Sequence, residues 1–247
     1  MWCGPASHDF GRYGGFDMYF DPMYFLFIAP AFIFSLWASW RTKSNFKKYS
    51  KVPVSSGMSG AEAAQRILDG AGIRDVSIGR SRGLLSDHYN PVKKNLALSD
   101  GVFDSRSLAA VGIAAHEAGH AIQHAQGYGP LKLRSMLVPT ASIGSNLGYI
   151  VMLMGLFFAS QNLVMIGAVL FSAVLFFQVV TLPVEFDASN RAKALVVEKG
   201  IVGIDERRGM DKVLNAAAMT YVAAVASSLA TLLYFLVRSG LLGGSRD

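Results

Sequence analysis

The sequence predicts a mainly α-helical integral membrane protein, with four transmembrane helices and a small α+β cytoplasmic portion. Of its 247 residues, 52% are apolar and only 16% are charged, against about 25% charged residues in ordinary soluble domains. The mean hydropathy is +0.35. Four apolar runs are long enough to cross a bilayer, which takes about 20 residues in a helix. These observations place the lipid bilayer among the partners of the chain.

The first predicted transmembrane helix covers residues 23–40. Aromatic side chains stand near both ends of this run, as in the aromatic belts of membrane proteins: Tyr19, Tyr24, Trp37 and Trp40. Residues 1–22, rich in Gly and Tyr, are predicted to be a flexible N-terminal segment. No cleavable signal peptide is expected, because the first apolar run starts late and lacks a basic region before it.

The next two spans form a predicted transmembrane hairpin over residues 137–182. One runs from about 137 to 158 and the other from about 163 to 182, with only the residues ASQN between them. The fourth predicted span covers residues 214–238 and leaves a C-terminal tail, residues 239–247. Two polar segments, residues 41–136 and 183–213, therefore separate the membrane-spanning parts.

The distribution of Lys and Arg predicts the orientation, since cytoplasmic loops carry the basic excess. Basic residues are dense after the first and third spans, whereas the hairpin loop has none. Those after the first span are Arg41, Lys43, Lys47, Lys48 and Lys51, and those after the third are Arg191, Lys193, Lys199, Arg207, Arg208 and Lys212. Both polar segments are therefore predicted to be cytoplasmic, in a multi-pass protein of the inner (plasma) membrane. The formal net charge of +6 fits basic loops near anionic lipid. No basic stripe is interleaved with aromatics, so no nucleic-acid partner is expected.

The segment 41–136 reads as a small α+β portion. A basic linker opens it, and a short helix follows, with Ser59 and Glu62 as a capping box. Short strands are predicted around VSIGR and within residues 83–103, where Gly and Pro interrupt the pattern. A second helix, capped by Asp104 or Ser105, is predicted to run to about Ala125.

That second helix carries an H-E-x-x-H motif at residues 116–120. Positions i and i+4 of a helix lie one above the other, so His116 and His120 point toward one spot. Two neutral imidazoles suit Zn²⁺, and Glu117 between them is placed to act as the general base for a zinc-activated water. The small residues around the motif allow another segment to approach closely, as a buried metal site requires.

A catalytic zinc needs a third protein ligand and one open position. His124 lies on the same stripe, but about 12 Å along the axis from His116 at about 1.5 Å per residue, so second-shell contact or polar packing suits it better. The longer metzincin pattern is absent, since it requires Gly at position 123 and His at position 126, where this chain has Gln.

Glu185 is the preferred third ligand. The hairpin returns Glu185 to the side of the membrane on which the H-E-x-x-H helix lies. Pro183 can start or kink the helix that presents Glu185. Asp187 is the competing carboxylate; on a helix it points about 200° away from Glu185, so only one of the two can face the zinc.

The stretches HEAGHAIQHAQGY and LPVEFDASNRA, with the apolar hairpin between them, resemble the YugP-like family of neutral zinc metallopeptidases of bacterial membranes, over roughly residues 23–238. The resemblance implies a membrane zinc peptidase with His116, His120 and a downstream glutamate as ligands. A looser similarity links the chain to the gluzincin membrane proteases of the HtpX and CAAX-processing type, which carry their glutamate in an E-x-x-x-D helix. Here Ser189 replaces that Asp, so Asp187, Ser189 or Asn190 is expected to orient the first histidine.

The combined prediction is a zinc-dependent endopeptidase with a zincin-like site at the cytoplasmic face, acting on membrane or membrane-adjacent polypeptides. Glu117 and Arg191 are the predicted catalytic residues, with Arg191 holding the oxyanion or, alternatively, anchoring the chain at the membrane. The stretch 93–100 is the predicted edge strand for an extended substrate. No regulatory membrane partner is identifiable from the sequence.

The sequence leaves two alternative functions. An intramembrane protease would require the H-E-x-x-H helix itself to span the bilayer, and its many polar side chains make that costly. A non-catalytic zinc-binding scaffold that recruits partners would need a fourth protein ligand. Only His124 or Asp187 offers one, and Glu117 would have no use there.

Overall fold

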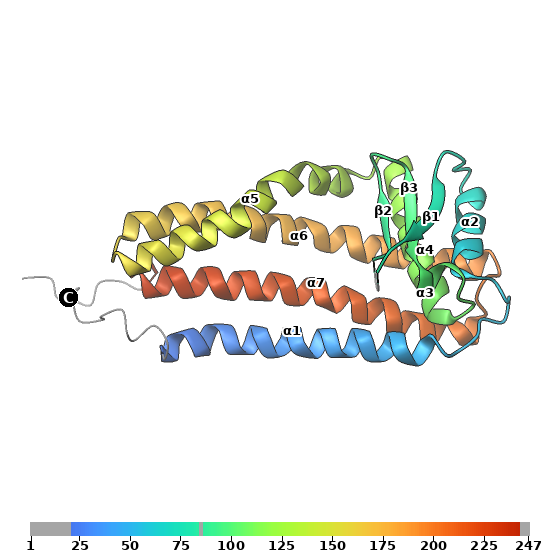
Figure 1. The fold of residues 1–247 in the computed structure, drawn as a ribbon, viewed down its shortest axis with the longest axis horizontal. Coiled ribbons are helices and arrows are strands. Elements are labelled where there is room, and N and C mark those ends of the chain that lie inside the picture. The colour runs from blue at the N-terminus through green and yellow to red at the C-terminus, as the bar shows by residue number, and fades with distance from the viewer. Residues whose placement is uncertain (1–20, 84–85, 243–247) are drawn as a thin grey trace, which may run out of the picture. The chain divides into compact units, whose positions relative to one another are not determined.

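The computed structural model describes residues 21–83 and 86–242, and confirms the mainly helical fold class (Figure 1). Within these residues, four helices are long and apolar enough to cross a membrane: α1 (Pro22–Tyr49), α5 (Gly129–Phe157), α6 (Gln161–Glu198) and α7 (Ile204–Arg238). The remaining elements are α2 (Gly60–Gly70), β1 (Ser77–Ser81), β2 (His88–Asn90), β3 (Asn95–Ser99), α3 (Asp100–Phe103) and α4 (Leu108–Ala125). The predicted flexible segment 1–22 lies outside the described residues except for its last two, and so does the end of the predicted tail.

All four long helices extend beyond the predicted apolar runs. Helix α1 continues through the basic residues that were expected to form a linker, and α6 continues through Pro183 to Glu198. Pro183 therefore does not start a helix. Hydropathy marks only the part of a helix that is apolar, whereas a helix continues into water as long as its backbone bonds are kept.

The chain divides into two compact units. The first unit comprises the described parts of residues 1–33, 139–176 and 226–247, and the second comprises residues 34–138 and 177–225. In the first unit, α5 and α6 pack closely through glycines: a Cβ on Gly148 would lie 2.7 Å from the backbone nitrogen of Phe171. Asp21, before α1, accepts hydrogen bonds from the Tyr234 hydroxyl at 3.1 Å and the Arg238 guanidinium at 3.0 Å.

The second unit contains the sheet, in the order β1-β3-β2. β3 pairs in parallel with β1, with Ser77 opposite Asn95, and antiparallel with β2, with His88 opposite Ala97. The prediction that residues 93–100 form an edge strand is therefore wrong. Most of β3 is buried, and this burial explains its central position; the edges are β1 and β2.

Helix α4 lies against α2 within the core of the second unit. The capping box of α2 is confirmed: the Ser59 hydroxyl accepts from the Glu62 amide, and the Glu62 carboxylate accepts from the Ser59 amide. The predicted cap of α4 is wrong, because Ser107 rather than Asp104 or Ser105 accepts from the Ala110 amide. Before Ser107 the chain is still extended, pairing with the segment around Pro53, so the helix cannot begin earlier.

Candidate metal centre

Helix α4 holds the H-E-x-x-H motif in the interior of the second unit. Gly119 is the motif residue that allows α6 to come close: a Cβ at this position would lie only 2.7 Å from the backbone oxygen of Ala188. Ala115 and Ala118 are fully buried beside it. The small residues of the motif therefore bring α6 against α4, as the sequence predicted.

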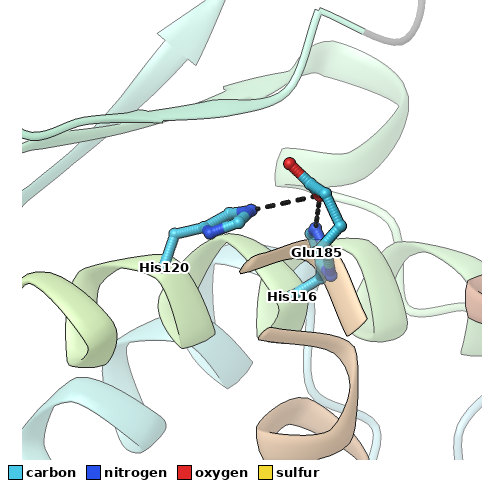
Figure 2. A group of neighbouring side chains, drawn as sticks. All are labelled: His116, His120 and Glu185. Carbon is cyan, nitrogen blue, oxygen red and sulfur yellow. Dashed lines mark hydrogen bonds and ion pairs between the residues drawn. The ribbon is translucent and has the colours of Figure 1, made fainter. Parts of the chain in front are cut away.

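His116, His120 and Glu185 converge from α4 and α6 (Figure 2). The His116 Nε2 atom lies 3.2 Å from Glu185 Oε2, and His120 Nε2 lies 3.5 Å from the same oxygen. Glu185 is only 2% exposed and His120 only 7%. Three potential ligand atoms thus face one point, and two of the three side chains are almost completely shielded from solvent.

The donor set and its spacing fit zinc. One ligand atom from each of the three residues lies within 4.8 Å of the others. A tetrahedral zinc with bonds of about 2.0–2.2 Å separates its ligand atoms by roughly 3.3–3.5 Å, and the two distances to Glu185 are close to this range. His116, His120 and Glu185 could therefore hold a metal ion, and two imidazoles with one carboxylate leave a tetrahedral position open.

Each histidine has a polar partner on its other ring nitrogen. His116 Nδ1 lies 3.1 Å from the Ser189 hydroxyl, and His120 Nδ1 lies 3.0 Å from Gln123 Oε1. Both contacts fix the ring orientation and favour the tautomer with a free Nε2, as hydrogen-bond partners of metal-binding histidines do. Of the three residues expected to orient the first histidine, Ser189 is the one in contact with it.

Asp187 and Arg191 belong to a polar chain behind His120. Gln123, which is fully buried, donates to Asp187 Oδ2 at 2.7 Å, and Arg191 Nε donates to the same oxygen at 2.5 Å. Arg191 also donates to Gln126 and lies over the Tyr128 ring. These two hydrogen bonds hold Asp187 in place and use two of the five N–H donors of Arg191. The oxyanion role of Arg191 stays a prediction.

Glu117 and a set of residues from α1, α4, α6 and α7 line a cavity of about 280 Å³ beside His116 and Glu185. The phenol of Tyr221 lines it close to Glu185 and Glu117. Arg134, from α5, has its Nη2 atom 3.5 Å from Glu185 Oε1. Its buried Nε has no hydrogen-bond partner among the described residues. Tyr221 and Arg134 are thus the additional donors near the site.

Sequence reasoning missed Gln123, Arg134 and Tyr221. Gln123 carried a usable signal, because residues at i and i+3 are neighbours on a helix and it lies three residues after His120. Arg134 and Tyr221 belong to different helices, and no motif spacing connects them to residues 116–120. Only the tertiary packing of the second unit brings them to the site.

The local charges are arranged to favour a cation. Burial alone disfavours the charged form of His120, but the neighbouring Glu185 and Glu117 carboxylates outweigh it and raise the pKa of His120 above its ordinary value. A divalent cation at the same point would meet the same negative field.

His124 lies apart from this cluster. Its Nδ1 atom is 2.8 Å from the Tyr89 hydroxyl of β2, and it is not among the grouped ligand atoms. The prediction of polar packing rather than direct ligation agrees with this contact.

The comparisons with known proteins agree with this geometry. Residues 24–240 match the family described as "putative neutral zinc metallopeptidase". The chain is also 47% identical over 216 residues, 87% of this chain and 96% of the relative, to the "Putative membrane protease YugP" of Bacillus subtilis (strain 168). No solved structure matches the chain. Since the family match covers most of the sequence, the chain belongs to this family of neutral zinc metallopeptidases.

Proposed function

We propose that the protein is a membrane-embedded zinc-dependent endopeptidase that hydrolyses peptide bonds of membrane or membrane-adjacent polypeptides. The observation that supports this most is the convergence of His116, His120 and Glu185 beside a cavity that Glu117 also lines. Metal-assisted hydrolysis requires a site for one metal ion with three protein ligands and an open position, and a carboxylate in the adjoining cavity. The family membership supports the same chemistry.

In the proposed reaction, the metal, the general base and the oxyanion donors have separate roles. When bound, zinc would activate the attacking water and polarise the scissile carbonyl. Glu117 accepts the proton from that water and returns it to the leaving amine. Tyr221 and Arg134, rather than Arg191, are the donors we assign to the developing oxyanion, because they lie next to Glu185.

The substrate backbone is proposed to lie extended along β2 rather than β3. β2 is an edge strand and contacts α4, and Asp87 immediately before it lines the cavity. Pairing with an exposed strand edge satisfies a peptide backbone without demanding a particular sequence. This replaces the role first predicted for residues 93–100.

We further propose that the site faces the cytoplasm in the inner membrane. The support is the Lys and Arg excess in residues 41–136 and 183–213, which both contribute to the second unit. Single cysteines at Ser56 and Arg207, both exposed, would be labelled from one side only in a Cys3-free background. Labelling of the two positions from opposite sides would contradict the proposed topology.

The decisive test of function is Glu117→Gln. The substitution keeps the size of the side chain but removes its ability to accept a proton. Zinc content should be unchanged, and hydrolysis of an unfolded membrane protein in detergent or liposomes should fall roughly 10²-fold or more, the usual scale for a general base. His124→Ala is the matched control, because His124 contacts Tyr89 instead of the cluster, and it should retain both zinc and hydrolysis.

Two results would contradict the proposal. Cleavage that survives Glu117→Gln would mean another base or a contaminating protease. A wild-type protein that binds zinc but cleaves nothing across a broad substrate panel would favour the non-catalytic scaffold.

A further inference from the structure

The cavity beside Glu117 has two chemically different sets of lining residues. One set is polar and belongs to the candidate metal centre and its surroundings, including His116, Glu185 and Tyr221. The other set consists mainly of apolar side chains from α1, α4 and α7: Phe46, Ile113, Val213, Leu214, Ala217 and Ala218. All of these residues belong to the second unit.

The other polar residues of the lining have partners within the protein. The Thr42 hydroxyl donates to the backbone oxygens of Ala38 and Ala216, each at 2.9 Å. Thr220 donates to the Ala217 oxygen at 2.6 Å, and the Asp87 carboxylate accepts from the Ser99 amide and hydroxyl. A polar group entering the cavity among these residues would therefore lose water and find few free partners, which costs free energy. An apolar group would gain from the same burial.

The size of the cavity limits what it can hold. Its volume of about 280 Å³ is slightly below the range of roughly 300–1,000 Å³ for pockets that hold whole small molecules. It is ample for one large side chain. A peptide whose scissile bond lies at His116 and Glu185 could place a neighbouring side chain in this cavity, whose lining includes Phe46 and Ala217.

We infer that this cavity is a specificity pocket that binds a large apolar side chain of the substrate, next to the bond that is cleaved. The inference rests on the proposed peptidase function and adds its substrate class: polypeptide segments with leucine- or phenylalanine-sized residues at the cleavage point. The location fits such substrates, because Thr42 of α1 directly follows Trp40 and Arg41, and Phe46 lies about one turn further along the helix. Trp and Arg are residue types typical of a membrane boundary.

The test fills the cavity and reads out side-chain preference. Ala217 is half-buried and lines the cavity, so Ala217→Leu should occupy the space needed by the substrate. Wild-type protein should cleave a peptide with leucine next to the scissile bond roughly 10- to 100-fold more efficiently than the same peptide with glycine. In Ala217→Leu this ratio should fall to within a few-fold, with zinc content unchanged. Ala224→Leu is the matched control, because Ala224 is half-buried on the same helix and does not line the cavity.

A binding measurement keeps the inference independent of turnover. A peptide hydroxamate with a leucine side chain should bind the zinc-loaded protein roughly 10- to 100-fold more tightly than the glycine hydroxamate, and Ala217→Leu should remove most of this difference. Val213→Phe, which fills the cavity from another turn of α7, serves if Ala217→Leu does not fold.

The outcomes separate the two proposals. Zinc binding and hydroxamate discrimination without any cleavage would overturn the peptidase function and leave the pocket in place. Cleavage without leucine preference, or a preference that Ala217→Leu leaves intact, would overturn the pocket and leave the peptidase function in place.

Discussion

The two units of the molecule bring α6 close to another helix in the same way, but with different surroundings. In the first unit, Gly148 of α5 meets the backbone of α6 at Phe171; in the second, Gly119 of α4 meets the backbone of α6 at Ala188. The neighbours of the first contact are apolar, with Met152, Val164 and Phe171 in one buried cluster. The neighbours of the second are His116, Glu185 and the polar chain behind them.

This difference shows that close helix approach serves two purposes here. In a lipid environment helices gain little from hydrophobic association, so small residues that let backbones touch supply van der Waals packing. In the second unit, the same approach places Glu185 within 3.2 Å of His116. There the contact fixes the geometry of a site as well as contributing to stability.

The sharpest way to test this comparison is to add one methyl group at each contact. A Cβ at Gly119 and a Cβ at Gly148 would each lie 2.7 Å from a backbone atom. Both Gly119→Ala and Gly148→Ala should therefore destabilise the fold, each by about 1–3 kcal/mol, as overpacking does. Only Gly119→Ala should also weaken zinc binding strongly, because α6 carries Glu185 away from α4.

Thermal unfolding and zinc titration in detergent measure the two effects separately. Equal losses of zinc affinity in both variants would contradict the division of roles between the units. Normal zinc affinity in Gly119→Ala would mean that the contact with Ala188 does not position Glu185.

The next largest effect is expected at Gln123. This side chain links His120 to Asp187, so Gln123→Leu removes the acceptor that holds the His120 ring and leaves Asp187 with one partner fewer. Zinc affinity should fall roughly 10- to 100-fold, the usual range for second-shell partners. Competition with a chelator of known affinity measures the change, and His124→Ala should leave the affinity as it is. An unchanged zinc affinity in Gln123→Leu would mean that the contact with Gln123 does not hold the His120 ring for metal binding.

The smallest effect is expected at Ser189. Its hydroxyl is a neutral partner of His116, and Ser189→Ala should weaken zinc binding by about tenfold or less, the lower end of the same range. Ser189→Asp should restore or strengthen binding, because a carboxylate is a stronger acceptor for the imidazole N–H. Weaker binding in Ser189→Asp than in Ser189→Ala would contradict the orienting role.

Much of the fold and the arrangement of the candidate site followed from local sequence patterns. Apolar length predicted the four long helices, and the i, i+4 spacing of His116 and His120 predicted two rings facing one point. Glu185 was reachable because a hairpin returns the chain to the side it left. These features depend on helix geometry and hydropathy, which are properties of short stretches.

What could not be predicted depends on how distant segments pack. Residues 93–100 were expected to form an edge strand, yet pairing with β1 and β2 makes β3, within this stretch, central. Arg191 was the expected oxyanion donor because it follows Glu185 closely; that role stays a prediction, but its hydrogen bond to Gln126 had no signal in the sequence. Arg134 and Tyr221 lie near Glu185 although they are far from it in the sequence, and neither carries a local signal.

The central claim is that His116, His120 and Glu185 hold one zinc ion in the second unit. The most direct measurement is the zinc content of purified wild-type protein and of Glu185→Ala, with His124→Ala as the control. The wild type and His124→Ala should each hold about one zinc per chain, and Glu185→Ala should hold almost none, because two histidines alone make an incomplete site. Full zinc retention in Glu185→Ala would contradict the claim and make Asp187 or His124 the third ligand to test.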